Sequence, residues 1–327
     1  MKALKPKVWS VWSPVIAAIL GILGVWLTVN VARDYGVLAF ILIPFAVGFA
    51  CSGLLRMEGP QKFARCFWSS SVSLALTAVG LLLVPLEGLA CLIMAFPLAY
   101  LPLLIGAAFG HLLFHQGNST SGRIVSILFL GAACTWAALD YKGPGAVAEV
   151  RTSIIVDASP EDVWVAVTQL SILPEPKDWF LRSGIACPKS AYIDGSGVGA
   201  TRVCVLSTGT MPERITVWEP GRALGFVALA TPPPLKEINP FFEFDPPHQH
   251  GYYKVLYGEF RIEALTGGRS RLTRVTRYES RIRPAFYWNW WCNFAAERAH
   301  RYVLEAVRAK VDKSGRTAMA EVPVVNE

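Results

Sequence analysis

Residues 149–167, EVRTSIIVDASPEDVWVAV, decide the fold of the second half of this sequence. The apolar residues 154–156 are typical of a strand. Ser159, Pro160 and the two acidic residues after them are typical of a helix start, because they suit the cap, the first helical position and the helix dipole. Apolar residues then recur at helical spacing as far as Leu170. The stretch predicts a strand that leads directly into an amphipathic helix.

A series of strand-like runs follows, and a long helical pattern ends the domain. The runs are Ala200–Leu206, Glu213–Trp218, Ala223–Leu229, Tyr252–Leu265 and Arg271–Ile282. From Ala285 to Lys313, apolar and small residues repeat at helical spacing. This order predicts an α+β domain at residues 146–313, with a curved antiparallel sheet around a long C-terminal helix. We expect residues 314–327 to form a disordered tail.

Five short motifs in this half occur in a fixed order. They are Ala158-Ser159-Pro160-Glu161-xx-Trp164, Gly197-x-Gly199-xx-Arg202, Glu213-Arg214-Ile215-xx-Trp218-Glu219-Pro220-Gly221, Gly258-x-Phe260-x-Ile262 and Leu272-xxx-Thr276-x-Tyr278. Together, over Glu149–Lys313, they resemble the SRPBCC superfamily of START-like, helix-grip proteins, which includes polyketide cyclase/dehydrase-like members. The resemblance implies a hydrophobic-ligand pocket between the sheet and the C-terminal helix. It implies no common catalytic set, so function does not follow from the fold.

The first 143 residues have a different composition. They contain 13 charged residues, about 9%, whereas residues 144–327 contain 42, about 23%, and the second value is ordinary for a soluble domain. The apolar runs in residues 1–143 are long enough for membrane helices. We expect an all-α transmembrane bundle with about five spans, at 9–31, 36–55, 66–86, 89–114 and 124–140. The last run is the shortest of the five.

The distribution of lysine and arginine predicts the orientation of these spans. Seven of these residues fall on the side of the N-terminus and two on the other side. The N-terminus is therefore expected in the cytoplasm, and five spans place the C-terminal domain outside a cell membrane. If the run at 124–140 does not cross, the domain is cytoplasmic.

Charge and cysteine spacing exclude several classes of site. The second half has a net charge of only +2, which argues against nucleic-acid binding. Its three cysteines form no CxxC motif, so we expect no metal and no cofactor. Glu87 is interpreted as an interfacial turn residue. His248 and His250 could place two rings on one side of an extended segment, but a solvated loop is the simpler interpretation.

Aromatic and polar residues of the predicted domain supply the candidate ligand pocket. The candidates are Trp179, Phe180, Arg202, Trp218, Phe260, Tyr278, Trp291 and Phe294. The alternative for each aromatic residue is plain core packing. Arg202 and Glu213 could bind a ligand head group or pair across neighbouring strands.

Three functions remain open. The first is membrane-anchored binding of a hydrophobic or amphipathic, lipid-like small molecule. The second is a cyclase- or hydrolase-type enzyme, for which Glu213, His248 and Tyr278 are the catalytic candidates. The third is a structural or signalling protein that binds a protein partner through Thr231–Gly251, a loop with six prolines and three phenylalanines.

Overall fold

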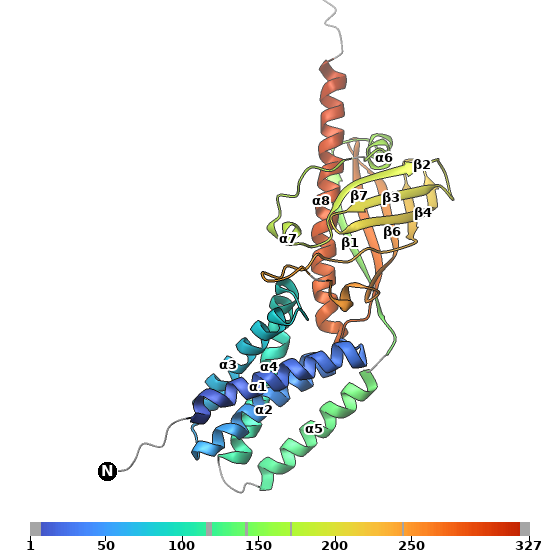
Figure 1. Ribbon diagram of the computed structural model, residues 1–327. Coiled ribbons are helices and arrows are strands. Elements are labelled where there is room, and N and C mark those ends of the chain that lie inside the picture. Colours follow the sequence, from blue (N-terminus) through green and yellow to red (C-terminus); the bar gives the residue numbers. More distant parts are fainter. Residues whose placement is uncertain (1–7, 116–119, 141–142, 171, 244, 321–327) are drawn as a thin grey trace, which may run out of the picture. The chain divides into compact units, whose positions relative to one another are not determined.

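The computed structural model describes residues 8–115, 120–140, 143–170, 172–243 and 245–320 (Figure 1). The chain forms two compact units. The first unit contains Met1–Pro144 together with Glu237–His248 and Ile282–Tyr287. The second contains Gly145–Lys236, Gln249–Arg281 and Trp288–Glu327. Two short segments from the second half of the sequence therefore pack with the N-terminal helices.

The first unit is helical, as its apolar composition predicts. Its helices are α1 (Val8–Trp26), α2 (Ile43–Leu55), α3 (Phe63–Leu83), α4 (Leu89–Phe114) and α5 (Thr120–Asp140). Short π-helical segments, η1 (Leu27–Ala32) and η2 (Leu38–Leu42), extend α1 and precede α2, and the 3-10 turn η3 (Arg56–Glu58) follows α2.

Four helices in the described residues are long and apolar enough to cross a membrane, rather than the five expected. They are Val8–Ala32, Leu38–Glu58, Phe63–Leu83 and Leu89–Phe114. Helix α5 forms where the fifth span was expected, but it is not among these four. By length and composition, the helices suit a membrane-associated protein.

The proline-rich loop does not run free, because part of it is hydrogen-bonded to the helical unit. The Leu89 backbone N–H donates to the Ile238 carbonyl oxygen at 2.8 Å. The Asn239 side-chain amide donates to the Leu82 carbonyl oxygen at 2.9 Å. Glu237–His248 is therefore attached at the turn between α3 and α4.

The second unit follows the predicted order of elements. Its strands are β1 (Ala146–Val156), β2 (Pro188–Asp194), β3 (Thr201–Leu206), β4 (Gly209–Glu219), β5 (Ala223–Ala228), β6 (Tyr253–Leu265) and β7 (Arg269–Ser280). Its helices are α6 (Pro160–Thr168), the short α7 (Trp179–Arg182) and α8 (Ala285–Ala320), whose first turn belongs to the first unit. Ser159 caps α6 as expected, since its hydroxyl accepts the Asp162 N–H at 3.2 Å.

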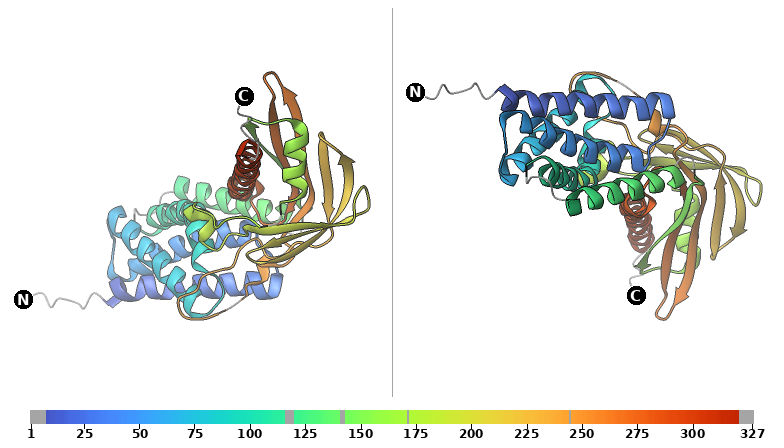
Figure 2. Two further views of the ribbon diagram at one scale, coloured as in Figure 1. Left: turned by 90° about the horizontal axis from the view of Figure 1, so that it is seen from above. Right: turned by 90° about the horizontal axis from the view of Figure 1, so that it is seen from below.

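The strands form one antiparallel sheet in the order β1-β7-β6-β5-β4-β3-β2. Figure 2 views α8 nearly end-on and shows it beside the curved sheet. The core between them includes Phe226 and Phe260 from the sheet and Leu304 and Val307 from α8. The expected α+β helix-grip architecture is thus confirmed.

Two details differ from the sequence analysis. Strand β2 was not predicted, and α8 continues to Ala320, through the first part of the expected tail. The rest of that tail lies outside the described residues.

Candidate functional site

A group of charged side chains lies on the sheet face that packs against α8. Arg202 on β3 and Glu213 on β4 are directly opposite in the strand register. Arg202 Nη1 and Glu213 Oε2 form an ion pair, and both residues are buried. The structure therefore has the cross-strand pair, the simpler of the two expected arrangements.

Arg274 on β7 adds a second cation to this group. Its guanidinium lies 4.8 Å from the ring centre of Phe226 and 4.5 Å from that of Phe260. The Arg202 guanidinium lies 4.4 Å from the Phe226 ring centre. Aromatic faces attract such cations. Two guanidinium groups, two rings and one carboxylate therefore share this part of the interior.

The hydrogen-bonding capacity of this group is incompletely used. Within the described chain, Arg274 Nη1 and Glu213 Oε1 are buried and have no hydrogen-bond partner. Burial lowers the pKa of Arg274 to about 10, and the nearby Arg202 cation contributes. Burial raises the pKa of Glu213, although Arg202 and Arg274 oppose that shift. A donor and an acceptor remain available beside excess positive charge.

His300 on α8 stands next to this group. Its Nδ1 lies 3.2 Å from the Thr152 hydroxyl and its Nε2 lies 2.7 Å from the Thr276 hydroxyl. Burial lowers the pKa of His300 to about 3, and the Arg274 cation adds to the effect. His300 is thus a neutral, fixed polar group between helix and sheet.

The predicted pocket residues occupy different surroundings. Phe260 and Tyr278 are buried between the sheet and α8, and the Tyr278 hydroxyl donates to Asn293 Oδ1 at 2.7 Å. Trp218 packs instead against Trp164 of α6, with ring centres 5.2 Å apart. Trp179 is 72% exposed. Trp218 therefore serves helix packing, and Trp179 faces solvent.

The remaining aromatic candidates form a second group at α7 and the early part of α8. The Phe180 and Phe294 ring centres are 5.0 Å apart, and those of Trp291 and Phe294 are 6.1 Å apart. The Arg298 guanidinium lies 4.4 Å from the Phe294 ring centre and pairs with Asp178. These three predicted residues are brought together.

His248 belongs to the first unit, whereas Glu213 and Tyr278 belong to the second. It lies in the 3-10 turn η4 (Pro247–Gln249) and is buried, whereas His250 is exposed. The expected solvated loop is therefore wrong for His248, because its side chain is buried.

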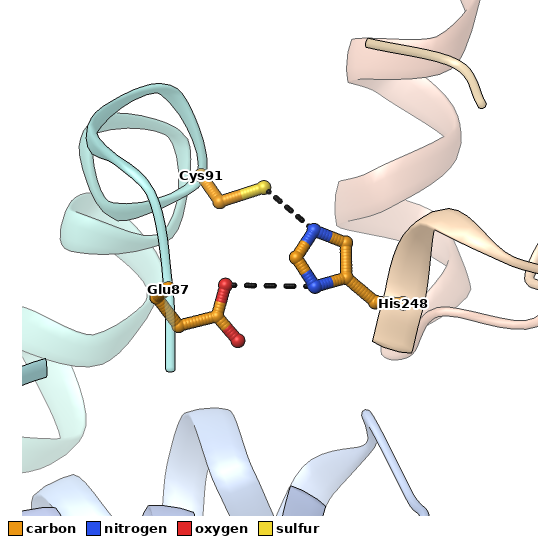
Figure 3. A group of neighbouring side chains, drawn as sticks. All are labelled: Glu87, Cys91 and His248. Atoms are coloured by element: carbon orange, nitrogen blue, oxygen red, sulfur yellow. Dashed lines mark hydrogen bonds and ion pairs between the residues drawn. The ribbon is translucent and has the colours of Figure 1, made fainter. Parts of the chain in front are cut away.

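The Cys91 thiol and the Glu87 carboxylate each lie beside a different ring nitrogen of His248 (Figure 3). Nε2 lies 3.2 Å from Cys91 Sγ, and Nδ1 lies 3.5 Å from Glu87 Oε2. Glu237 Oε1 lies 4.0 Å from Nε2. Burial and the Glu237 carboxylate raise the pKa of Glu87 to about 8. Glu87, Cys91 and His248 could hold a metal ion.

Sequence reasoning missed Arg274, His300, Cys91 and Glu237. Arg274 could have been found, because it alternates with the exposed arginines of its strand and shares parity with Leu272 and Tyr278. Cys91 and Glu237 are 146 positions apart, and no local pattern joins them.

Comparisons with known proteins were made for the whole sequence. No family model and no curated protein matches it. Similar solved structures include the Zhui aromatase/cyclase from Streptomyces sp. R1128, with 16% identity and a TM-score of 0.37, covering 53% of this chain and 98% of that one. A norcoclaurine synthase point mutant from Thalictrum flavum has 11% identity and a TM-score of 0.35, covering 53% and 99%. A START superfamily protein from Mycobacterium smegmatis has 11% identity and a TM-score of 0.34, covering 50% and 97%.

These likenesses concern about half of this chain. The strand order and the long C-terminal helix of the second unit agree with the SRPBCC-like fold that the sequence motifs imply.

Proposed function

We propose that this protein is membrane-embedded and that its helix-grip domain binds an amphipathic, lipid-like small molecule with an acidic or carbonyl head group. The head group would meet the Arg202–Glu213–Arg274 group, and the apolar part would lie along the aromatic and aliphatic residues between sheet and α8. Four apolar helices would keep the domain beside the membrane, where such molecules partition.

The observation that carries this proposal is the excess cation in the interior. The Glu213 carboxylate pairs with Arg202, the Glu259 carboxylate that also acts on Arg274 pairs with Arg261, and Arg274 Nη1 is a buried donor without a hydrogen-bond partner in the described part of the chain. An unsatisfied buried donor of this kind costs about 1–3 kcal/mol. A ligand oxygen at Nη1 would remove that cost, and a carboxylate would also balance the charge.

The test uses the full chain in lipid nanodiscs and a fluorescent fatty acid as probe. We expect saturable binding that falls at least tenfold in affinity in Arg274→Met. The matched control is Arg271→Met, since Arg271 lies on the opposite face of the same strand and pairs with Glu263 at 2.9 Å. Equal affinities for the two variants, or no saturable binding by the folded wild type, would contradict the proposal.

The position of the domain relative to the membrane is a second part of the proposal. Segments between helices gather at two ends of the first unit. At one end, Ser10 N–H donates to Glu58 Oε1 at 2.7 Å, and Gln61 N–H donates to His115 Nδ1 at 3.0 Å. At the other, Val37 N–H donates to Asp140 Oδ2 at 3.2 Å.

Helix α5 joins these two ends. It begins six positions after α4 ends near the first, and its last residue, Asp140, lies at the second. Arg283 also reaches the second end, where its N–H donates to the Tyr35 carbonyl oxygen at 2.8 Å. Since α1 begins at the first end, where Ser10 contacts Glu58, we infer that the C-terminal domain emerges on the opposite, extracytoplasmic side.

A further inference from the structure

Both ring nitrogens of His248 lie close to side chains that can bind a proton or a cation. Nε2 faces Cys91 Sγ at 3.2 Å and Glu237 Oε1 at 4.0 Å, while Nδ1 faces Glu87 Oε2 at 3.5 Å. All four residues belong to the first unit. Figure 3 shows the thiol and the Glu87 carboxylate on opposite edges of the ring.

Backbone contacts hold these groups in place. Cys91 lies in the first turn of α4, and its N–H donates to Glu237 Oε1 at 3.2 Å. The neighbouring Leu89 N–H is bonded to the Ile238 carbonyl. A Cβ atom at Gly88 would lie only 2.0 Å from Glu237 Oε2. The carboxylate therefore occupies a close-fitting position that requires glycine.

The Glu237 carboxylate has unused capacity at this position. Its side chain is fully buried, and its Oε2 atom has no hydrogen-bond partner among the residues described. A carboxylate offers about four lone-pair sites, and the Cys91 N–H donates to Oε1 rather than to Oε2. A buried carboxylate in such surroundings is stabilised by a cation.

We propose that Cys91 Sγ, His248 Nε2 and the Glu237 carboxylate bind a divalent transition-metal ion of the zinc class. Thiolate, imidazole and carboxylate are the ligand types that zinc uses. Two such ligands on a tetrahedral ion lie about 3.3–3.5 Å apart, and His248 Nε2 lies 3.2 Å from Cys91 Sγ and 4.0 Å from Glu237 Oε1. The Cys91 thiol releases its proton to solvent when the ion binds.

Glu87 has the position of an orienting carboxylate in this site. Carboxylates commonly accept the second N–H of a metal-binding imidazole, which fixes its tautomer. Three protein ligands leave the fourth position of a tetrahedral ion for water or another ligand. The arrangement is that of an open site rather than a closed structural one.

A cysteine nucleophile with a histidine base is the competing use of the same groups. It needs a thiolate without a metal, and the Glu237 carboxylate beside Cys91 opposes that charge. The carboxylate instead favours a cation at the thiol.

The experiment uses the full chain in detergent, stripped with a chelator and titrated with Zn²⁺ or Co²⁺. We expect about one ion per chain, and a thiolate-to-Co²⁺ absorption band that disappears in Cys91→Ser. Glu237→Gln should weaken binding strongly, and Glu87→Gln should weaken it about 10- to 100-fold. The matched control is Cys66→Ser, since buried Cys66 lies 3.8 Å from another imidazole, at His111 Nδ1.

Three results would overturn the proposal. One is no saturable Zn²⁺ or Co²⁺ binding by protein that is folded by circular dichroism and size exclusion. Another is a Co²⁺ band that persists in Cys91→Ser. The third is iodoacetamide labelling of Cys91 at the same rate with and without Zn²⁺, which would favour the nucleophile.

Discussion

His300 illustrates how a single polar residue can make the domain sensitive to acid. Its pKa is about 3 in the folded protein, against about 6.5 in an unfolded chain. The unfolded chain therefore binds a proton first as the pH falls. The stability contributed by neutral His300 is complete above about pH 6.5 and is lost as the pH falls towards 3.

We predict that His300→Gln reduces this acid sensitivity. Between pH 7 and 5, the thermal midpoint of the wild type should fall more steeply than that of the variant. The underlying free energy of unfolding should differ in its pH slope by at most about 1.4 kcal/mol per pH unit. Thermal unfolding of the full chain in detergent at a series of pH values measures it. The same substitution at exposed His250 serves as the control. Parallel pH profiles for wild type and His300→Gln would refute the assignment.

At this scale the sequence predicts residue types better than partners. Glu213, Phe260 and Tyr278 could be chosen because polar and aromatic residues stand out in apolar strands. Trp218 could not be placed, because β4 has an irregularity between Ile215 and Val217 that shifts the alternation of its side chains. Bulges of this kind leave little trace in a single sequence.

At the scale of elements, α2 and α4 are packed through glycines. A Cβ atom at Gly106 would lie 2.0 Å from the Phe45 carbonyl oxygen, and one at Gly48 would lie 2.0 Å from that of Leu103. Both obstacles are backbone atoms, which cannot move aside as a flexible side chain can. Small residues allow such close approach of membrane helices.

Gly106→Ala should therefore destabilise the helical unit by about 1–3 kcal/mol, the usual cost of overpacking. Gly131→Ala is the matched control, because Gly131 is also in a helix and its added Cβ would meet no atom within 4 Å in the described structure. The measurement is the thermal midpoint of each full-length variant in detergent. If both substitutions have the same effect, helix propensity rather than packing explains it.

The elements themselves were largely predictable. Residues 149–167 contain a strong cap and clear periodicities, and they form β1 and α6 as expected. The strand β2 was missed because Pro188–Asp194 has only one short run of apolar and aromatic residues, 191–193, between polar residues. Its pairing with β3, and not its own pattern, makes it a strand.

At the scale of the whole molecule, the role of α5 decides on which side the second unit lies. Its 21 residues span about 30 Å, enough for a hydrocarbon core. It is not among the four helices of the described residues that are counted as long and apolar enough to cross. The contact of Asp140 with Val37 N–H, and the ion pair between Asp140 Oδ1 and Arg283 Nη1 at 3.0 Å, place its end with the loop between α1 and α2.

Two reporter fusions test whether α5 crosses. One follows His115, after four apolar helices, and the other follows Gly143, after α5. If α5 crosses, the two reporters should lie on opposite sides of the membrane, with the His115 fusion cytoplasmic and the Gly143 fusion outside. Reporters on the same side would show that α5 does not cross, and the C-terminal domain would then face the cytoplasm. The domain would in that case sample the inner leaflet, so the same measurement also determines which lipids it can reach.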